Sequence, residues 1–368
     1  MSPPAESPVA RLPVARLPVA RPPVTELNVG YYAHHHGAGH VTRALAIAAA
    51  FDGPLTLFGS RLPERVALPN VQLCPLPPDV AAGVEGEAFA CLHYAPLGVA
   101  GLRERMGLLV DWFRRAWPCL LVVDVSVEVA LLARLCGVPT IYLRQRGSRF
   151  DAAHELAYAS ASRLLAPYPD CLEEPDTPAA WRAKTCYAGS LSRYAGHGPD
   201  RGREPGTVTV IAGHGGTAFS RARLVAAARA CPAWHWTVLG PVLDDAIEAP
   251  ANLTFLGSVA DPAPWLTRAE LVVGSAGDSL VAELADLRCR FLCLPDARPF
   301  DEQLSTGRLL AAQDLAITCE SWPADEDWPG LLARARELDP ERWAAVSDGE
   351  GARRAAACIR QVAHEVLA

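Results

Sequence analysis

Short hydrophobic runs rich in β-branched and aromatic residues alternate with alanine-rich or amphipathic segments along most of the chain. Runs of about four to eight such residues are typical of buried strands, and the segments between them are typical of helices. In the first half, the predicted strands are residues 27–33, 53–59, 71–76, 119–125 and 139–144. In the second half, they are residues 207–213, 235–240, 252–258, 270–276 and 290–295. Strands separated by helices form βαβ units, so the pattern predicts an α/β protein with parallel sheets.

A segment rich in glycine, proline and charge, residues 187–206, separates the two sets of strands. This composition is typical of a linker, and 368 residues are more than one hydrophobic core usually serves. We therefore predict two facing Rossmann-like domains, each a doubly wound parallel sheet, over residues 25–190 and 207–368, with a linker over residues 191–206. Ligands of such sheets bind at the carboxyl ends of the strands, so the site is expected in the cleft between the domains.

Residues 1–24 are predicted to be a disordered tail. The segment PVARLPVARLPVARPPV repeats a five-residue unit with a proline in every copy. Proline at this spacing prevents a stable helix, and the repeat has no face that could be buried. The tail is therefore not expected to contribute to the fold.

Composition and charge exclude several classes of protein. Half of the residues are hydrophobic and a fifth are charged, as in globular proteins with sizeable cores. The net charge of −7 argues against a nucleic-acid partner, because surfaces that bind nucleic acid are basic. No hydrophobic run reaches the ~18 residues of a transmembrane helix. The 11 cysteines form no CxxC pair and no secretory signal precedes them, so we expect reduced thiols and a cytoplasmic protein, at most peripheral at a membrane.

Four histidines lie within seven positions in the stretch YYAHHHGAGHVTRALAIA, residues 31–48. The stretch joins a predicted strand to a predicted helix through a glycine-containing turn, which directs backbone N–H groups and a helix N-terminus toward a ligand. His34, His35 and His36 are consecutive, so their side chains alternate in direction and cannot converge on one metal ion. No zinc-type ligand spacing supports them, and we expect no metal site. They are assigned to the lining of a pocket or to solvent.

The second informative stretch is residues 274–310. A predicted strand runs through a glycine turn into a helix predicted over residues 278–287, where Ser275, Gly277 and the first amides of the helix are placed to hold a diphosphate. Glu283 lies in that helix, below the turn. Its carboxylate could accept hydrogen bonds from two ribose hydroxyls, or it could be a solvated helix position. The spacing leaves both alternatives open.

A similar glycine turn, AGHGGT at residues 212–217, follows the first predicted strand of the second half. Its residues Gly215 and Gly216 could cover the phosphates from the other side. One glycine turn is weak evidence for a nucleotide, but two turns in one domain together with an acidic helix residue are stronger.

The stretch 274–310 resembles the nucleotide-sugar signature of two-domain glycosyltransferases with the GT-B fold. It is most similar to the family of the peptidoglycan N-acetylglucosaminyltransferase and to macrolide and plant natural-product glycosyltransferases. Those proteins carry a glycine, a glutamate six residues later, a strand that ends in proline, and an acidic–Gln pair, here Gly277, Glu283, Pro295 and Glu302–Gln303. The resemblance implies the GT-B fold and a nucleoside diphosphate sugar, UDP- or dTDP-linked, as co-substrate without a further cofactor.

The resemblance also implies a set of donor-binding residues. The helix glutamate would hold the ribose, the acidic–Gln region would bind hydroxyls of the donor sugar, and the backbone after FLGS would contact the base. In this chain the set is Val259, Ser275, Gly277, Asp278, Ser279, Glu283, Asp301, Glu302 and Gln303, together with Gly215 and Gly216. The serines at 275 and 279 are a departure, because many relatives have a histidine or an asparagine around this glycine.

The first half resembles the same family in GAGHVTRALAIA (37–48) and CLLVVDVSVEVALLARLCGVP (119–139). In the natural-product enzymes the loop histidine is the general base and a strand-end aspartate orients it; the matching residues are His40 and Asp124. An imidazole with a pKa of about 6.5 can take the proton of a sugar hydroxyl, and a carboxylate on its other nitrogen stabilises the imidazolium. Direct attack would invert the anomeric centre. The remaining residues expected on the acceptor side are His36, Gly37, Gly39 and Arg43.

Several alternatives stay open. His40 could be a capping or packing histidine, and Asp124 could cap the following helix. The GHxxR arrangement that ends at Arg43 also resembles nucleotide-sugar hydrolases of this fold, which use water as the acceptor. A nucleotide-sugar binding protein without turnover is a third alternative. Residues 93–117 could form a pocket for a sugar, natural-product or lipid acceptor, or its large apolar side chains could be packed core: Leu109, Trp112, Phe113 and Trp117.

Overall fold

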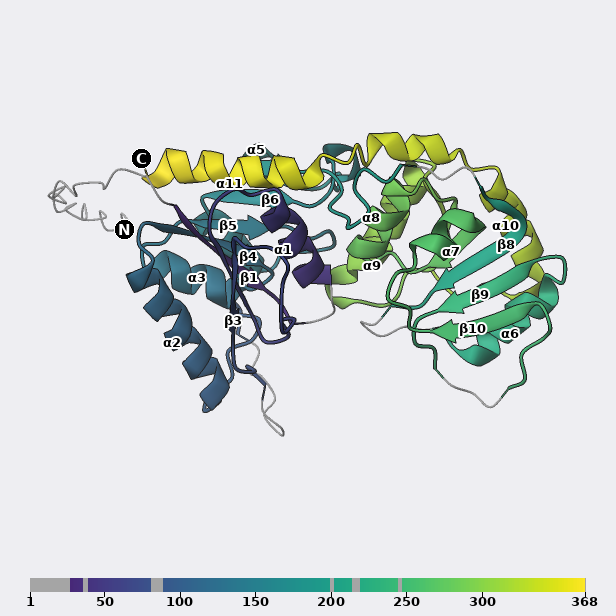
Figure 1. Cartoon of the computed structure of the whole chain (residues 1–368), viewed down its shortest axis with the longest axis horizontal. Helices are drawn as coiled ribbons and strands as arrows, with labels where there is room; N and C mark the ends of the chain where they lie inside the picture. Colours follow the sequence, from purple (N-terminus) through teal and green to yellow (C-terminus); the bar gives the residue numbers. More distant parts are fainter. Residues whose placement is uncertain are drawn as a thin grey trace, which may run out of the picture.

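The computed structural model describes residues 27–35, 39–80, 89–198, 202–213, 219–243 and 247–367. These residues form two parallel sheets, one of seven strands and one of six, each with helices on both faces (Figure 1). The structure therefore confirms the predicted α/β class with two Rossmann-like domains. The predicted N-terminal tail lies outside the described residues. No helix of the described part is long and apolar enough to cross a membrane.

The first sheet has the strand order β3-β2-β1-β4-β5-β6-β7 and contains only parallel pairs. Its strands are β1 (Asn28–Ala33), β2 (Leu55–Gly59), β3 (Val71–Pro75), β4 (Cys119–Asp124), β5 (Thr140–Leu143), β6 (Arg163–Ala166) and β7 (Thr185–Tyr187). The chain runs outward from β1 to β3 and then returns to place β4 on the other side of β1. This reversal opens a crevice at the carboxyl ends of β1 and β4, where Ala33 is paired with Asp124.

The central strands of the first sheet are buried on both faces, as expected for a parallel sheet. Side chains alternate between two cores: Leu120 and Val122 pack with one, and Leu121 and Val123 pack with the other. The covering helices of this domain are α1 (Gly39–Ala49), α2 (Ala100–Arg115), α3 (Val127–Leu135), α4 (Ala152–Ser160) and α5 (Ala179–Lys184).

The large apolar residues of segment 93–117 are mostly packed core, on α2 and just after it. Leu109 and Phe113 are buried, and Trp112 packs against the same core, close to Gly30 of β1. Trp117 differs, because its side chain is half exposed. The core interpretation is therefore confirmed for three of the four residues and wrong for Trp117.

The second sheet has the strand order β10-β9-β8-β11-β12-β13 and is also entirely parallel. Its strands are β8 (Glu204–Ile211), β9 (His235–Leu239), β10 (Leu253–Gly257), β11 (Ala269–Gly274), β12 (Phe291–Cys293) and β13 (Ala316–Thr318). Its helices are α6 (Arg221–Ala230), α7 (Ala263–Arg268), α8 (Asp278–Asp286), α9 (Glu302–Ala312) and α10 (Trp328–Arg336). The order reverses between β8 and β11, so α8, which follows β11, begins at the crevice of this domain.

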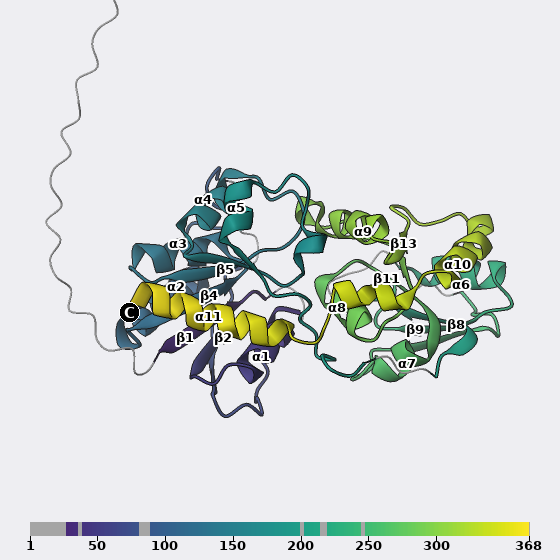
Figure 2. The ribbon, with the colours of Figure 1, turned by 90° about the horizontal axis from the view of Figure 1, so that it is seen from above.

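The last helix, α11 (Gly351–Leu367), lies along the first domain instead of the second (Figures 1 and 2). Its apolar side chains, including Ala355, Ile359 and Val362, share a core with Ile47 of α1 and the first sheet. The prediction that the second domain extends over residues 207–368 is therefore corrected at its C-terminal end. The amphipathic pattern of α11 predicts a buried face, but it does not indicate which sheet that face covers.

Candidate active site

His40 and Asp124 meet at the carboxyl edge of the first sheet. Asp124 is the last residue of β4 and is fully buried, and His40 lies in the first turn of α1, which follows β1. His40 Nδ1 lies 2.9 Å from Asp124 Oδ1, and the Tyr31 hydroxyl donates to Asp124 Oδ2 at 2.9 Å. An ionised carboxylate can only accept, so this contact favours the tautomer with the proton on Nδ1 and leaves Nε2 as the basic nitrogen. Arg43 Nη2, which can only donate, also lies 3.2 Å from Nδ1 and would favour the other tautomer; the shorter carboxylate contact is the one that the proposed base requires.

Asp124 does not cap the following helix. Ser126 caps α3 instead, and its hydroxyl accepts from the amide of Val129 at 3.2 Å. The buried carboxylate therefore binds side chains from β1 and α1, including His40, the partner that the family resemblance implies.

Arg43, one turn after His40 on α1, also binds Asp124. Its Nε donates to Oδ2 at 3.1 Å and its Nη2 donates to Oδ1 at 3.0 Å, a bidentate arrangement. Burial alone would raise the pKa of Asp124, but the charge of Arg43 and the contact with His40 outweigh it and hold that pKa well below its usual range. The aspartate is therefore ionised at neutral pH. Its negative charge faces both Arg43 and His40.

On the opposite side of the cleft, α8 begins at Asp278 behind the N-cap residue Gly277. Gly277 has no side chain to accept from the first-turn amides, which leaves these donors for a ligand. A Cβ added to Gly39 would lie 2.5 Å from Ser279 Oγ, so the N-termini of α1 and α8 are in contact where the two domains meet. Ser275 is buried in the turn between β11 and α8.

Glu283 is buried in α8 and is not a solvated position. Its Oε1 accepts from Arg193 Nε at 2.9 Å. Burial raises the pKa of Glu283, and Arg193 opposes the shift. Because Arg193 is 41% exposed, it can turn to solvent when a ligand takes its place at the carboxylate.

The Asp301–Glu302–Gln303 segment starts α9. Phe300 and Asp301 both have positive φ angles, 61° and 53°, which form the sharp turn before this helix. Gln303 Oε1 accepts from the amide of Asp296 at 2.8 Å, and its Nε2 lies near Gly277. The acidic–Gln segment and the diphosphate turn, predicted to act together, are therefore neighbours.

The other predicted site residues divide into two groups. Val259 follows β10 and is half-buried. His36, Gly37, Gly215 and Gly216 lie outside the described residues. The histidines before them are described: the His34 and His35 rings stack at 4.6 Å, and His34 lies 5.8 Å from the His40 ring. His35 Nδ1 lies 3.8 Å from Asp79 Oδ1.

Two arginines that the sequence analysis missed also enter the cleft. Arg146 and Arg149 follow β5, and both are buried. Arg146 Nη2 donates to Asp278 Oδ1 at 2.6 Å, and Arg149 Nη2 donates to Glu302 Oε2 at 2.7 Å. The sequence could have indicated them, because RQRGSR comes directly after a buried strand, at the edge of the sheet where ligands bind.

Solved structures with a similar fold include glycosyltransferases of several kinds. The glycotransferase of kitacinnamycin superposes with a TM-score of 0.63 over 91% of this chain and 98% of its own, at 15% sequence identity. MurG from Acinetobacter baumannii superposes with a TM-score of 0.59 over 92% of this chain and 99% of its own, at 16% sequence identity. Arabidopsis thaliana UGT89C1, complexed with UDP-L-rhamnose, superposes with a TM-score of 0.65 over 93% of this chain and 99% of its own, at 16% sequence identity.

No protein-family model matches the sequence, and no curated protein is significantly similar to it. At the identities of the structural neighbours, the likeness shows the fold alone. It covers nearly the whole of each chain, both domains included. The protein therefore has the GT-B fold that the sequence resemblance implied.

Proposed function

We propose that the protein is a glycosyltransferase that moves a sugar from a nucleoside diphosphate sugar to an acceptor hydroxyl with inversion. One observation supports the proposal: the His40–Asp124 pair lies beside the N-terminus of α8 where the two domains meet, with Gly39 against Ser279. A general base and an anion-binding helix end thus face each other, as transfer from a diphosphate requires.

The donor would bind to the second domain. The first-turn amides of α8, with Ser275 and Ser279, would hold the diphosphate, and Glu283 would hold the ribose. The base would contact the backbone at Val259, and the sugar hydroxyls would contact Asp301, Glu302 and Gln303. The positive end of α8 supplies the charge that a divalent cation supplies in other enzymes, so we propose a metal-independent reaction. The proposed donor is a UDP- or dTDP-sugar, as the family resemblance implies.

In the transfer step, His40 Nε2 takes the proton of the acceptor hydroxyl as its oxygen bonds to the anomeric carbon. The bond from that carbon to the diphosphate breaks, and its electron pair leaves with the nucleoside diphosphate. Asp124, on Nδ1, stabilises the imidazolium that forms. Because attack and departure occur on opposite faces, the anomeric configuration inverts.

The test is incubation of the purified protein with UDP- and dTDP-sugars, with and without candidate acceptors, followed by quantification of glycosylated product, free sugar and nucleoside diphosphate. Acceptor-dependent release of nucleoside diphosphate with a glycosylated product supports transfer. Release of equal amounts of free sugar and nucleoside diphosphate at a rate unaffected by acceptors would assign the protein to the hydrolases. Donor that binds but stays intact in every condition would leave a binding protein.

A further inference from the structure

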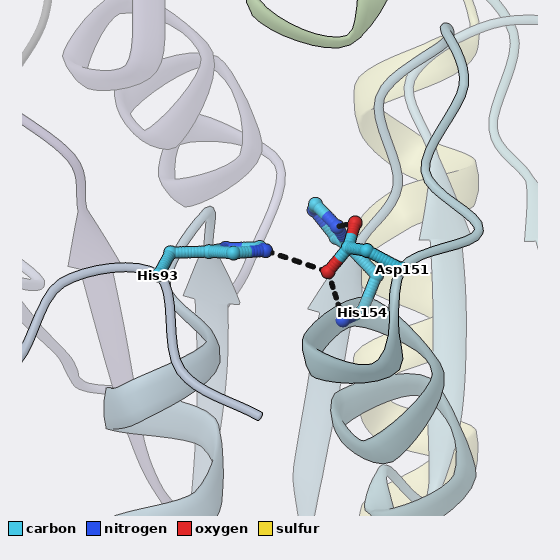
Figure 3. Close-up of side chains that lie close together, drawn as sticks. All are labelled: His93, Asp151 and His154. Atoms are coloured by element: carbon cyan, nitrogen blue, oxygen red, sulfur yellow. Dashed lines mark hydrogen bonds and ion pairs between the residues drawn. The ribbon is translucent and has the colours of Figure 1, made fainter. Parts of the chain in front are cut away.

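Two histidines and an aspartate of the first domain gather where the loop before α2 meets the start of α4 (Figure 3). His93 Nε2 lies 2.8 Å from Asp151 Oδ1, and His154 Nδ1 lies 2.5 Å from Asp151 Oδ2. The three potential ligand atoms all lie within 4.8 Å of one another. The proposed transfer reaction uses none of these side chains.

The spacing suits a small cation. A tetrahedral Zn²⁺ ion with bonds of about 2.0–2.2 Å to nitrogen and oxygen holds its ligand atoms roughly 3.3–3.5 Å apart. The two separations from Asp151, 2.8 and 2.5 Å, are shorter than this, and the outer limit of 4.8 Å is longer. An ion at the centre would move the carboxylate away from each imidazole and draw the imidazoles together.

The three side chains are held in place by contacts of their own. The backbone amide of His93 donates to Glu128 Oε1 at 2.7 Å. Asp151 caps α4 by accepting from the amide of His154 at 3.1 Å. The imidazoles of His93 and His154 pack with their centres 4.4 Å apart, and the Phe300 ring meets His154 edge-on. The three residues are therefore kept near one another before any ion arrives, although their ligand atoms must still move to bind one.

We propose that His93 Nε2, one carboxylate oxygen of Asp151 and His154 Nδ1 bind a divalent transition-metal ion, with Zn²⁺ the best suited and water as the fourth ligand. Two imidazoles and a carboxylate favour Zn²⁺ over Mg²⁺ and Ca²⁺, which prefer oxygen ligands alone. The His93 and Asp151 side chains are 33% and 35% exposed, so an ion can enter from solvent. The ion would brace the loop before α2 against α4.

Arg149 couples this site to the cleft. Its Nη1 lies 3.2 Å from His154 Nε2, and a guanidinium can only donate, so Nε2 accepts and Nδ1 carries the proton. An ion on Nδ1 displaces that proton, and a neutral imidazole then carries its proton on Nε2, facing Arg149. Arg149 must therefore release His154, and its charge opposes the ion as well. Because Arg149 also binds Glu302 at 2.7 Å, ion binding and the position of Glu302 are linked.

The test is a titration of the chelator-treated full-length protein with Co²⁺, followed by visible absorption and by competition with Zn²⁺. We expect one equivalent of Co²⁺ to bind and to show ligand-field bands. The chain has 11 cysteines that could also bind Co²⁺, and binding to them would add a near-ultraviolet thiolate charge-transfer band, which we do not expect. Removing a residue that only orients a metal ligand costs about 10–100-fold in affinity, so losing a ligand itself should cost about 100-fold or more. His93→Ala and Asp151→Asn should both show such a loss, and Arg149→Gln should bind several-fold more tightly.

His34→Ala and His235→Ala are the matched controls, one in the other histidine cluster and one exposed on β9. Both should bind like the parent, and circular dichroism should show that all variants are folded. The proposal is overturned if no Co²⁺ binds, if a thiolate band accompanies binding, or if His93→Ala binds as well as the parent. Loss of binding in His34→Ala would place the ion at the other cluster instead.

Discussion

Arg146 donates from its Nη2 to Asp278 Oδ1 at 2.6 Å and so joins the loop after β5 of the first domain to the first residue of α8 in the second. The Arg146 side chain is 3% exposed, and Arg43 approaches the other oxygen of Asp278 at 3.5 Å. The two domains are thus held together by charge at the turn proposed to bind the diphosphate. An incoming diphosphate must share these arginines with the Asp278 carboxylate or take them over.

The first prediction concerns this ion pair. Arg146→Gln and Asp278→Asn should each lower the melting temperature by a few degrees, at about 2–4 °C for each kcal/mol lost in a domain of this size. The double variant should melt no lower than the worse single variant, because the pair is broken only once. Calorimetry measures this directly. The exposed pair Arg308 and Glu320 is the control and should show no measurable coupling. Additive shifts for Arg146 and Asp278 would contradict the pairing.

His40→Ala tests the proposed base. The variant should still bind donor, because the proposed donor groups lie in the second domain, whereas turnover should fall by about 10²–10⁴, the usual contribution of a positioned acid–base group. Calorimetric titration of the donor and a product assay measure the two effects separately. His235→Ala serves as the matched histidine control. Unchanged turnover in His40→Ala would remove it from catalysis.

The effect of Asp124→Asn on the free energy of unfolding should depend on pH. The folded-state pKa of Asp124 is lowered, so its contribution to stability is fully present well above the unfolded value of about 3.9 and is lost as the pH falls from about 5. At pH 7 the variant leaves Arg43 as a buried, poorly compensated charge and should lose about 3 kcal/mol or more. The difference between parent and variant should shrink at pH 3, as urea unfolding at both pH values would reveal. An equal difference at both would contradict the assignment.

Glu283→Ala tests the proposed ribose contact. Loss of a charged hydrogen bond should weaken nucleoside diphosphate binding by about 1.5–3 kcal/mol. The fold should tolerate the change, because Arg193 can turn to solvent. Isothermal titration with UDP and dTDP gives the affinities, and Glu320→Ala, an exposed position on the same domain, is the control. Equal affinity of Glu283→Ala and parent for every nucleotide would exclude this residue from the site.

Chelator treatment should leave turnover intact, because the helix end and the arginines supply positive charge at the proposed diphosphate position. The measurement is the initial rate before and after exhaustive dialysis against chelator. Activity that disappears and returns with Mg²⁺ or Mn²⁺ would show that a cation is required at the diphosphate. The ion proposed at His93, Asp151 and His154 shares no ligand with the proposed diphosphate position, so its removal should not abolish transfer, although it can change the rate through Arg149 and Glu302.

Much of the fold follows from the sequence, because buried parallel strands are continuous hydrophobic runs. All ten predicted strands are present, whereas β6, β7 and β13 were missed. These three strands have three or four residues; β5 and β12 are as short, but each lies within a longer hydrophobic run, PTIYLR or RFLCLP. The meeting of His40 and Asp124 was predicted from the family resemblance, and it agrees with their places after β1 and at the end of β4, which are neighbouring strands.

Other parts of the site depend on tertiary packing that no local pattern encodes. The partners of Arg146 and Arg149 lie in the opposite domain, more than 130 positions along the chain. His93 and Asp151 are 58 positions apart, without any ligand spacing that could be recognised. Arg43 was expected on the acceptor side, but its bidentate grip on Asp124 could not be read from its position three residues after His40.

The return of α11 to the first domain has a mechanical consequence. The chain passes between the domains twice, once between β7 and β8 and once before Gly351, so the two halves are tethered at two points. A second crossing limits the motion of one domain relative to the other more than a single linker would. A truncation before Gly351 would remove one crossing and would also strip an apolar cover from Ile47 and its neighbours, so the shortened chain should both lose control of cleft opening and tend to aggregate.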